Sequence, residues 1–167
     1  RRQRQMCIRD SIDADEIKSL SYDANFRFTF FRRFTNFDFD WETKKLTSTG
    51  QYDWQATLME APIYDPLNVQ VELRKRLMLG ETEFSLVLPE IKTGELVENT
   101  YAIKGETIFN LEGKEYPCVI LERVRTQDNR ITTYTMAKDL NYLIFKVTDN
   151  DPDGDIALTI KQLLSFG

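Results

Sequence analysis

Two hydrophobic patterns divide this chain: apolar residues recur at helical spacing in one stretch and alternate with polar residues along much of the rest. The helical stretch has its own start and stop signals. Asp65 can accept hydrogen bonds from the free amides of a first turn, Pro66 suits the first helical position, and Gly80 suits the left-handed residue just past the end. The pattern therefore predicts one long helix over residues 65–79.

The predicted helix has one apolar face. Leu67, Val71 and Met78 recur at spacings of four and seven, and Leu73 and Leu77 widen the stripe. The polar positions expected to point elsewhere are Asn68, Glu72, Lys75 and Arg76. The first residues of the stretch also alternate strictly between apolar and polar, as a half-buried strand does, but the length and the capping signals favour a helix.

Strands are predicted before the helix, although the pattern starts late. Residues 12–23 are polar with scattered apolar positions, which indicates a short helical turn or loop. Two Phe-rich runs follow and should form a hairpin that turns about Thr35 and Asn36. Two more short strands are expected over residues 46–49 and 52–59.

After the helix the alternating pattern resumes. The predicted strands cover residues 84–88, 99–104, 106–111, 116–125, 130–136, 142–148 and 155–163. Only short polar turns separate them, whereas parallel strands need long crossover connections. The sequence therefore predicts a mostly β (α+β) fold, an antiparallel meander with one embedded helix that packs on the sheet.

The first ten residues differ in character from the rest, with four Arg and no periodicity. The run MCIRD before Ser11 is what a transposase mosaic-end sequencing adapter encodes in frame. We therefore interpret residues 1–10 as a translated adapter rather than as an Arg-rich arm or targeting segment. Removing four Arg and one Asp changes the net charge from −5 to −8. On this interpretation residues 11–167 form a single domain whose native amino terminus, with any export signal, is missing.

Composition argues against several classes of function. A net charge of −5 argues against nucleic acid as a partner, because its phosphates reward clustered Lys and Arg. The chain contains no His, which removes His-based triads, His general bases and His zinc ligands. No apolar run approaches the ~18 residues of a membrane-spanning helix. We expect neither a metal ion nor a cofactor.

Several short motifs follow one another in a characteristic order. They are Phe39-Asp40-Trp41, Tyr64-Asp65-Pro66-Leu67 with Leu73-Arg74 and Gly80, Tyr101 with Gly105-Glu106 and Gly113, Glu122-Arg123, and Ala137-Lys138-Asp139-Leu140 with Tyr142. From about Phe37 to Leu163 the chain thereby resembles the bacterial domain of unknown function 3108. Thr135 stands where the family pattern has Trp, and Ile144 where it has Pro.

This resemblance implies an exported protein of the bacterial envelope, usually made with a signal peptide, periplasmic and without an established activity. It also implies a strongly curved antiparallel sheet, a half-barrel similar to the periplasmic lipoprotein carriers, with a helix against its concave side.

A hydrophobic ligand on such a sheet would meet six candidate residues, which are Trp41, Trp54, Leu67, Val71, Arg74 and Met78. The two Trp could line an apolar cavity, since pockets are mostly apolar, or they could belong to the core. Arg74 lies within the apolar stripe, so a carboxylate or carbonyl must meet its guanidinium, or its head must reach water. Alternatively, Arg74 could hold an anionic head group.

Three further patterns are better explained by structural roles. Residues 149–155 resemble the start of a calcium loop, but Ile160 replaces the necessary Glu, which favours a polar hairpin turn. Cys118 is expected to be a small buried hydrophobic residue. Asp38 and Asp40 share a strand face and could be a glycosidase pair, although the solvent side of a strand is the better interpretation.

We therefore expect a non-enzymatic envelope protein that binds or carries a hydrophobic or lipid-like ligand, or that chaperones a lipidated partner. The alternative is a structural or interaction domain whose core is filled by its own side chains. A hydrolase is the third hypothesis, because the sequence offers no evident nucleophile, base or metal constellation. The sequence does not predict the oligomeric state.

Overall fold

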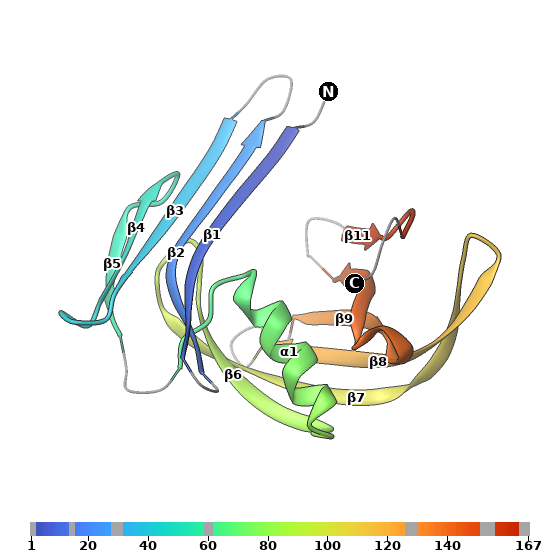
Figure 1. Ribbon diagram of the computed structural model, residues 1–167. Coiled ribbons are helices and arrows are strands. Elements are labelled where there is room, and N and C mark those ends of the chain that lie inside the picture. The colour runs from blue at the N-terminus through green and yellow to red at the C-terminus, as the bar shows by residue number, and fades with distance from the viewer. Residues whose placement is uncertain are drawn as a thin grey trace. The chain divides into compact units, whose positions relative to one another are not determined.

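The computed structural model describes residues 3–13, 16–27, 32–58, 62–125, 130–150 and 156–163 of the 167-residue chain. In these ranges the fold is mostly β, with two antiparallel sheets and one α-helix (Figure 1), which confirms the predicted fold class. The chain divides into two compact units, Arg1–Gln70 with Leu86–Val97, and Val71–Ser85 with Glu98–Gly167. The elements α1, β6 and β7 each cross this division, and the single domain over residues 11–167 stays a prediction.

The first sheet follows the chain order. Its five strands are β1 (Gln3–Asp13), β2 (Glu16–Arg27), β3 (Arg32–Asp40), β4 (Lys45–Gly50) and β5 (Trp54–Thr57). The helical turn or loop predicted over residues 12–23 is wrong, since Ile12 pairs with Ile17 and Asp23 pairs with Asn36. Residues 16–23 form a strand because they pair with β1 and β3, and the local hydrophobic pattern gave no sign of that pairing.

The predicted turn about Thr35 and Asn36 is also wrong, because β3 runs straight through both residues. Thr35 pairs with Ala24 of β2 on one side and with Gly50 of β4 on the other, so it lies in the middle of a three-stranded part of the sheet. The antiparallel pairing of β2 with β3 does agree with the predicted hairpin. β1 includes most of residues 1–10, but strand pairing does not test where a segment came from, and the adapter origin stays a prediction.

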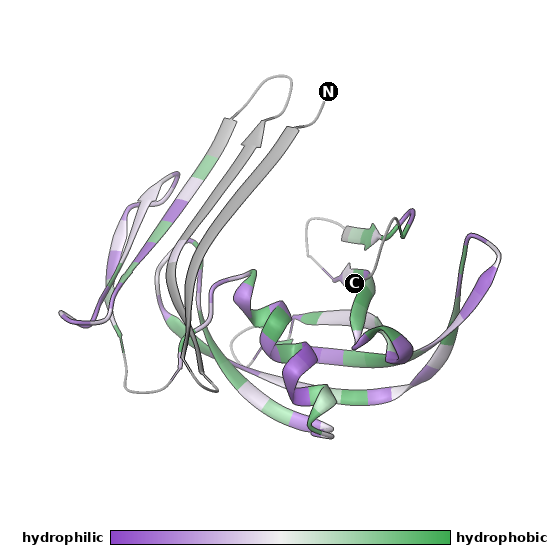
Figure 2. Cartoon of the chain, in the orientation of Figure 1, coloured by the Kyte–Doolittle hydropathy of each residue, from purple (hydrophilic) through white to green (hydrophobic). Residues whose placement is uncertain are grey.

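The second sheet is a meander, as predicted. Its strands are β6 (Glu83–Pro89), β7 (Leu96–Leu111), β8 (Lys114–Arg125), β9 (Ile131–Ala137), β10 (Leu143–Asp149) and β11 (Ile156–Thr159), with the 3₁₀ turn η1 (Lys138–Leu140) between β9 and β10. β7 joins two predicted strands into one, and its register shifts between Ile103 and Gly105. The β7–β8 hairpin bends along its length, and hydrophobic and hydrophilic residues alternate on it (Figures 1 and 2).

The helix α1 (Asn68–Met78) lies within the predicted range of 65–79, and the predicted capping residues flank it. Asp65 Oδ1 accepts hydrogen bonds from the amides of Leu67 at 2.7 Å and Asn68 at 2.9 Å, and Gly80 has φ +83° just past the end. These groups satisfy amides and carbonyls that a helix end would otherwise leave without partners.

The predicted buried face of α1 is wrong at two of its positions. Val71 is 47% exposed and Met78 is 53% exposed. Leu73 and Leu77 of the predicted stripe are buried, which confirms that part of the prediction. They are joined by Val69, which is not part of the predicted stripe, and by Asn68 and Glu72, which the pattern places elsewhere. Glu72 tolerates burial because Arg76, one turn later, pairs with its carboxylate at 2.7 Å.

Candidate functional site

Two of the predicted ligand residues, Trp41 and Trp54, pack against the core of the first sheet. Phe37, Phe39, Leu46, Leu58 and Ile63 form that core, and Leu67 packs against the same cluster. The Trp54 ring lies 5.3 Å from the Phe37 ring, centroid to centroid, and Trp41 stacks on Phe39 at 6.2 Å. The structure therefore brings Trp41, Trp54 and Leu67 to one core, as the core interpretation of the aromatic residues expects.

Trp54 is fixed from two further directions. Its indole Nε1 donates a hydrogen bond to the carbonyl of Ile91 at 2.8 Å. The ring also lies directly against Gly94, where a Cβ atom would stand 2.3 Å from the Trp54 Cε3 atom. These contacts give Trp54 a structural role in its unit.

The other predicted residues, Val71, Arg74 and Met78, lie on the exposed side of α1. Arg74 Nε donates a hydrogen bond to the carbonyl of Asn141 at 2.8 Å, which confirms that a carbonyl meets this guanidinium. Leu79 follows Met78 and is 69% exposed, so it extends the same surface. Sequence reasoning omitted Leu79, although its place eight residues after Val71, next to Met78, could have identified it.

A second group of side chains, which sequence reasoning missed, crosses four strands of the second sheet. Tyr101 on β7 pairs with Arg123 on β8, Arg123 with Thr132 on β9, and Thr132 with Asp149 on β10. Side chains of directly paired residues lie on one face of a sheet. We refer to Tyr101, Arg123, Thr132 and Asp149 as the polar row.

Hydrogen bonds connect the polar row from Arg123 to Asp149. Arg123 Nη2 donates to Thr132 Oγ1, which in turn donates to Asp149 Oδ1 at 2.8 Å. Arg130 adds a two-point ion pair, with its Nε donating to Asp149 Oδ1 at 3.2 Å and its Nη2 to Oδ2. Thr132 is buried, while the side chains of Arg130 and Asp149 are 25% and 19% exposed, so this chain of bonds is only partly buried.

Two polar atoms at the other end of the row form no well-directed hydrogen bond with the residues that the structure describes. They are the hydroxyl of Tyr101 and Nε of Arg123. Burial raises the pKa of Tyr101 well above its usual value, and the guanidinium of Arg123 opposes this only in part. Arg123 lowers the pKa of the hydroxyl both by its charge and by a side-chain hydrogen bond, although that bond is not well directed. The hydroxyl therefore keeps its proton at neutral pH and remains a donor.

An apolar row lies beside the polar row on the same face. Moving two residues along each strand gives Ile103, Leu121, Tyr134 and Val147, which are again directly paired. Leu121 is fully buried and Tyr134 nearly so. The Tyr101 ring also stacks on Phe84 at 5.5 Å. This face of the sheet therefore carries hydrogen-bonding side chains in one row and mostly apolar side chains in the next.

The ion pair of Asp149 predicts a dependence of stability on pH. Burial alone would raise the pKa of Asp149, but hydrogen bonds from Arg130 and Thr132 outweigh it and lower the pKa below the usual value of an Asp carboxyl group. As the pH falls, Asp149 takes up a proton in the unfolded chain before it does so in the folded chain. The stability that the ionised carboxylate contributes above the unfolded pKa is therefore lost as the pH falls through the lower, folded pKa. We expect the pH dependence of urea unfolding between pH 5 and 3 to be shallower in Asp149→Asn than in the wild type. An equal slope in both proteins would contradict this.

The remaining candidate residues lie where structural roles place them. Cys118 is buried in β8, and burial raises the pKa of its thiol, which disfavours a thiolate nucleophile. Asp38 and Asp40 are exposed on β3, as predicted. Residues 151–155 of the possible calcium loop lie outside the described residues. Within the described ranges, no three His, Cys, Asp or Glu residues gather as metal ligands would.

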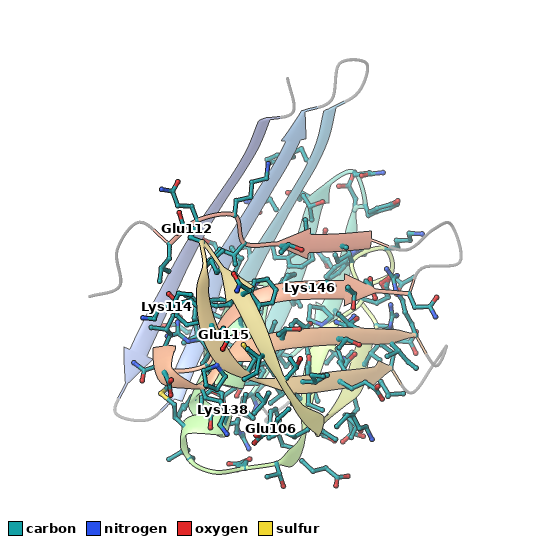
Figure 3. All side chains as sticks on the ribbon, turned by 90° about the vertical axis from the view of Figure 1, so that its right-hand side faces the viewer. Glu106, Glu112, Lys114, Glu115, Lys138 and Lys146 are labelled. Carbon is teal, nitrogen blue, oxygen red and sulfur yellow. The ribbon has the colours of Figure 1, made fainter. Side chains whose placement is uncertain are left out.

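Charged side chains of both signs are interspersed on the part of the second unit shown in Figure 3. Those labelled there are Glu106, Glu112, Lys114, Glu115, Lys138 and Lys146. Lys138 Nζ lies 2.9 Å from Glu106 Oε1. Such mixed charges are typical of a solvated surface.

A scan against models of protein families finds no match, and neither do searches of the curated proteins and the solved structures. The resemblance to the bacterial domain of unknown function 3108 therefore stays a prediction. Among the described residues, no helix has the length and apolarity needed to cross a membrane.

Proposed function

We propose that this protein is a non-enzymatic binding or carrier module of the bacterial envelope, and that it takes a hydrophobic or lipid-like ligand. The observation that supports this proposal is the outer face of α1, formed by Val71, Met78 and Leu79. Their side chains are 47%, 53% and 69% exposed. Apolar surface gains roughly 25 cal/mol for each Å² removed from water, so a ligand that covers this face would be stabilised there.

Charge indicates the kind of ligand. Lys75 lies one turn from both Val71 and Leu79, and Arg74 lies one turn from Met78. Long cationic side chains beside an apolar surface place their stems along it and their charges at its edge. This combination suits an amphiphile with an apolar chain and an anionic head group, and it agrees with the predicted roles of Val71, Arg74 and Met78.

The alternative function, a structural or interaction domain with a filled core, also has an observation in its favour. Trp41, Trp54 and Leu67 pack into the core of their own unit. The two proposals differ in what they expect of the α1 surface, because only the first requires it to contact a small amphiphile.

Titration with lysophosphatidylglycerol below its micelle concentration, followed by calorimetry and native mass spectrometry, tests the first proposal. We expect the wild type to bind one or a few molecules. Val71→Ser/Met78→Ser should weaken binding about tenfold or more, since two exposed apolar contacts of roughly 1 kcal/mol each are lost. Both positions are exposed, so folding should be preserved.

Ile108→Ser is the matched control, because Ile108 is 59% exposed on β7 in the same unit. This variant should bind as the wild type does. Absence of binding by the wild type, or equal binding by the double variant, would favour the structural alternative. Lipid that accompanies the full-length protein purified from its envelope would identify the natural ligand class.

A further inference from the structure

We propose that Arg74 selects the head group of the ligand, acting as a fixed pair of donors for an oxyanion, either a phosphate or a carboxylate. The inference rests on the proposed binding face of α1 and specifies what the edge of that face recognises. It begins with the contacts of Arg74. Its Nε donates a hydrogen bond to the carbonyl of Asn141 at 2.8 Å, whereas Nη1 and Nη2 form no hydrogen bond or ion pair with the described residues.

The charge of Arg74 is not neutralised in the way that the charge of its neighbour is. Arg76 pairs with Glu72 at 2.7 Å and with Glu81 at 3.1 Å, so it faces two carboxylates. Arg74 meets only a neutral carbonyl. The residues three and four positions from Arg74 on α1 are also uncharged, and they are Gln70, Val71, Leu77 and Met78. Arg74 therefore keeps a positive charge that can attract an anion.

The turn that supplies the carbonyl has an unusual backbone. Asn141 and Tyr142 both adopt left-handed conformations, with φ +50° and +56°. Asn tolerates this conformation, but it is rare for a bulky residue such as Tyr and strains the backbone. Strained residues cluster at sites where a group must be held in one place. The group held here is the carbonyl of Asn141, which fixes the guanidinium of Arg74 through Nε.

A guanidinium that is held through Nε presents its two Nη atoms together on its far edge. Their N–H groups lie in one plane and match two oxygens of a single phosphate or carboxylate. Val71 and Met78 lie about one turn from Arg74 on either side and are 47% and 53% exposed. An apolar chain that covers these two side chains would bring its head group to Arg74. The ligand class is therefore an amphiphile whose oxyanion is close to its apolar chain.

Calorimetric titration with three probes that share a dodecanoyl chain tests the inference, each probe being used below its micelle concentration. Lysophosphatidylglycerol has a phosphate, dodecanoate has a carboxylate, and monododecanoylglycerol has no charge. We expect the wild type to bind at least one of the two anions about tenfold more tightly than the neutral probe, the gain of one charged two-point contact. The anion that shows this preference identifies the head group.

Arg74→Lys is the decisive variant, because it keeps the positive charge and removes the pair of coplanar donors. Its preference for the anion should fall to about threefold or less, since a single charge close to water contributes little. Its affinity for the neutral probe should equal that of the wild type, which shows that the variant is folded. Lys146→Gln is the matched control, because it removes a positive charge from β10 in the same unit and leaves α1 unchanged. It should keep the full preference.

Three outcomes would overturn the inference and leave the proposed function intact. They are equal affinity of the wild type for all three probes, a tenfold preference that survives in Arg74→Lys, and an equal loss of preference in Lys146→Gln, which would assign the preference to net charge. In each of these cases Val71→Ser/Met78→Ser would still weaken binding. Absence of binding of every probe by the wild type would overturn both proposals.

Discussion

Gly94→Ala is expected to cost about 3–4 kcal/mol of folding free energy, the largest loss that we predict for a single methyl group. The added Cβ would lie 2.3 Å from the Trp54 ring, which the packing on Phe37 and the hydrogen bond to Ile91 hold in place. The backbone adds to the cost, because Gly94 has φ +73°, a conformation that L residues avoid. Urea unfolding would measure the loss, and a red shift of the Trp emission would show that Trp54 has moved.

Gly113→Ala is the matched control for the steric part of this effect. Gly113 has nearly the same φ, +79°, in the turn between β7 and β8, but no atom of the described residues lies within 4 Å of the place that an added Cβ would take. It should therefore lose only about 1–2 kcal/mol, the cost of the left-handed backbone. Equal losses in the two variants would show that the contact between Gly94 and Trp54 is not tight.

Arg76→Met is expected to cost about 3 kcal/mol, because it leaves the carboxylate of Glu72 buried without its cation. The Glu72 side chain is only 4% exposed and lies 2.7 Å from Arg76 Nε. Arg76 also pairs with Glu81 at 3.1 Å and covers the Phe84 ring, and the Met side chain retains part of that apolar cover. Urea unfolding of the variant would measure the loss.

The double variant Glu72→Met/Arg76→Met should recover most of the stability, since replacing both members of a buried pair removes the uncompensated charge. Lys138→Met is the surface control. Its partner Glu106 is 67% exposed, so this variant should change stability by less than about 1 kcal/mol. A loss in Arg76→Met no larger than in Lys138→Met would mean that Glu72 is not effectively buried.

Local signals predicted the capping residues of α1 but only part of its buried face. Asp65 and Gly80 act on neighbouring backbone groups, so their roles can be read from the sequence alone. Two faces of the helix carry apolar residues about one or two turns apart, one with Leu67, Val71 and Met78, and the other with Val69, Leu73 and Leu77. The second face is the buried one, and pairing with Arg76 reduces the cost of burying Glu72 on it.

The polar row could not be predicted from the sequence. Tyr101, Arg123, Thr132 and Asp149 are up to 48 positions apart in the chain and form no motif. Only the strand register places them opposite one another. The same limitation explains the errors in the first sheet, where pairing with β3 makes residues 16–27 a strand despite their irregular polar pattern.

The sequence by itself determined the fold class, the antiparallel meander, the capping residues of the helix and the solvent side of β3. These features depend on alternation, capping and turn residues, which act over a few positions of the chain. Only the tertiary structure decided which face of α1 is buried, that Trp54 lies against Gly94, and that two buried donors meet at Tyr101 and Arg123. Those outcomes depend on contacts between distant residues, whose partners and register no local pattern specifies.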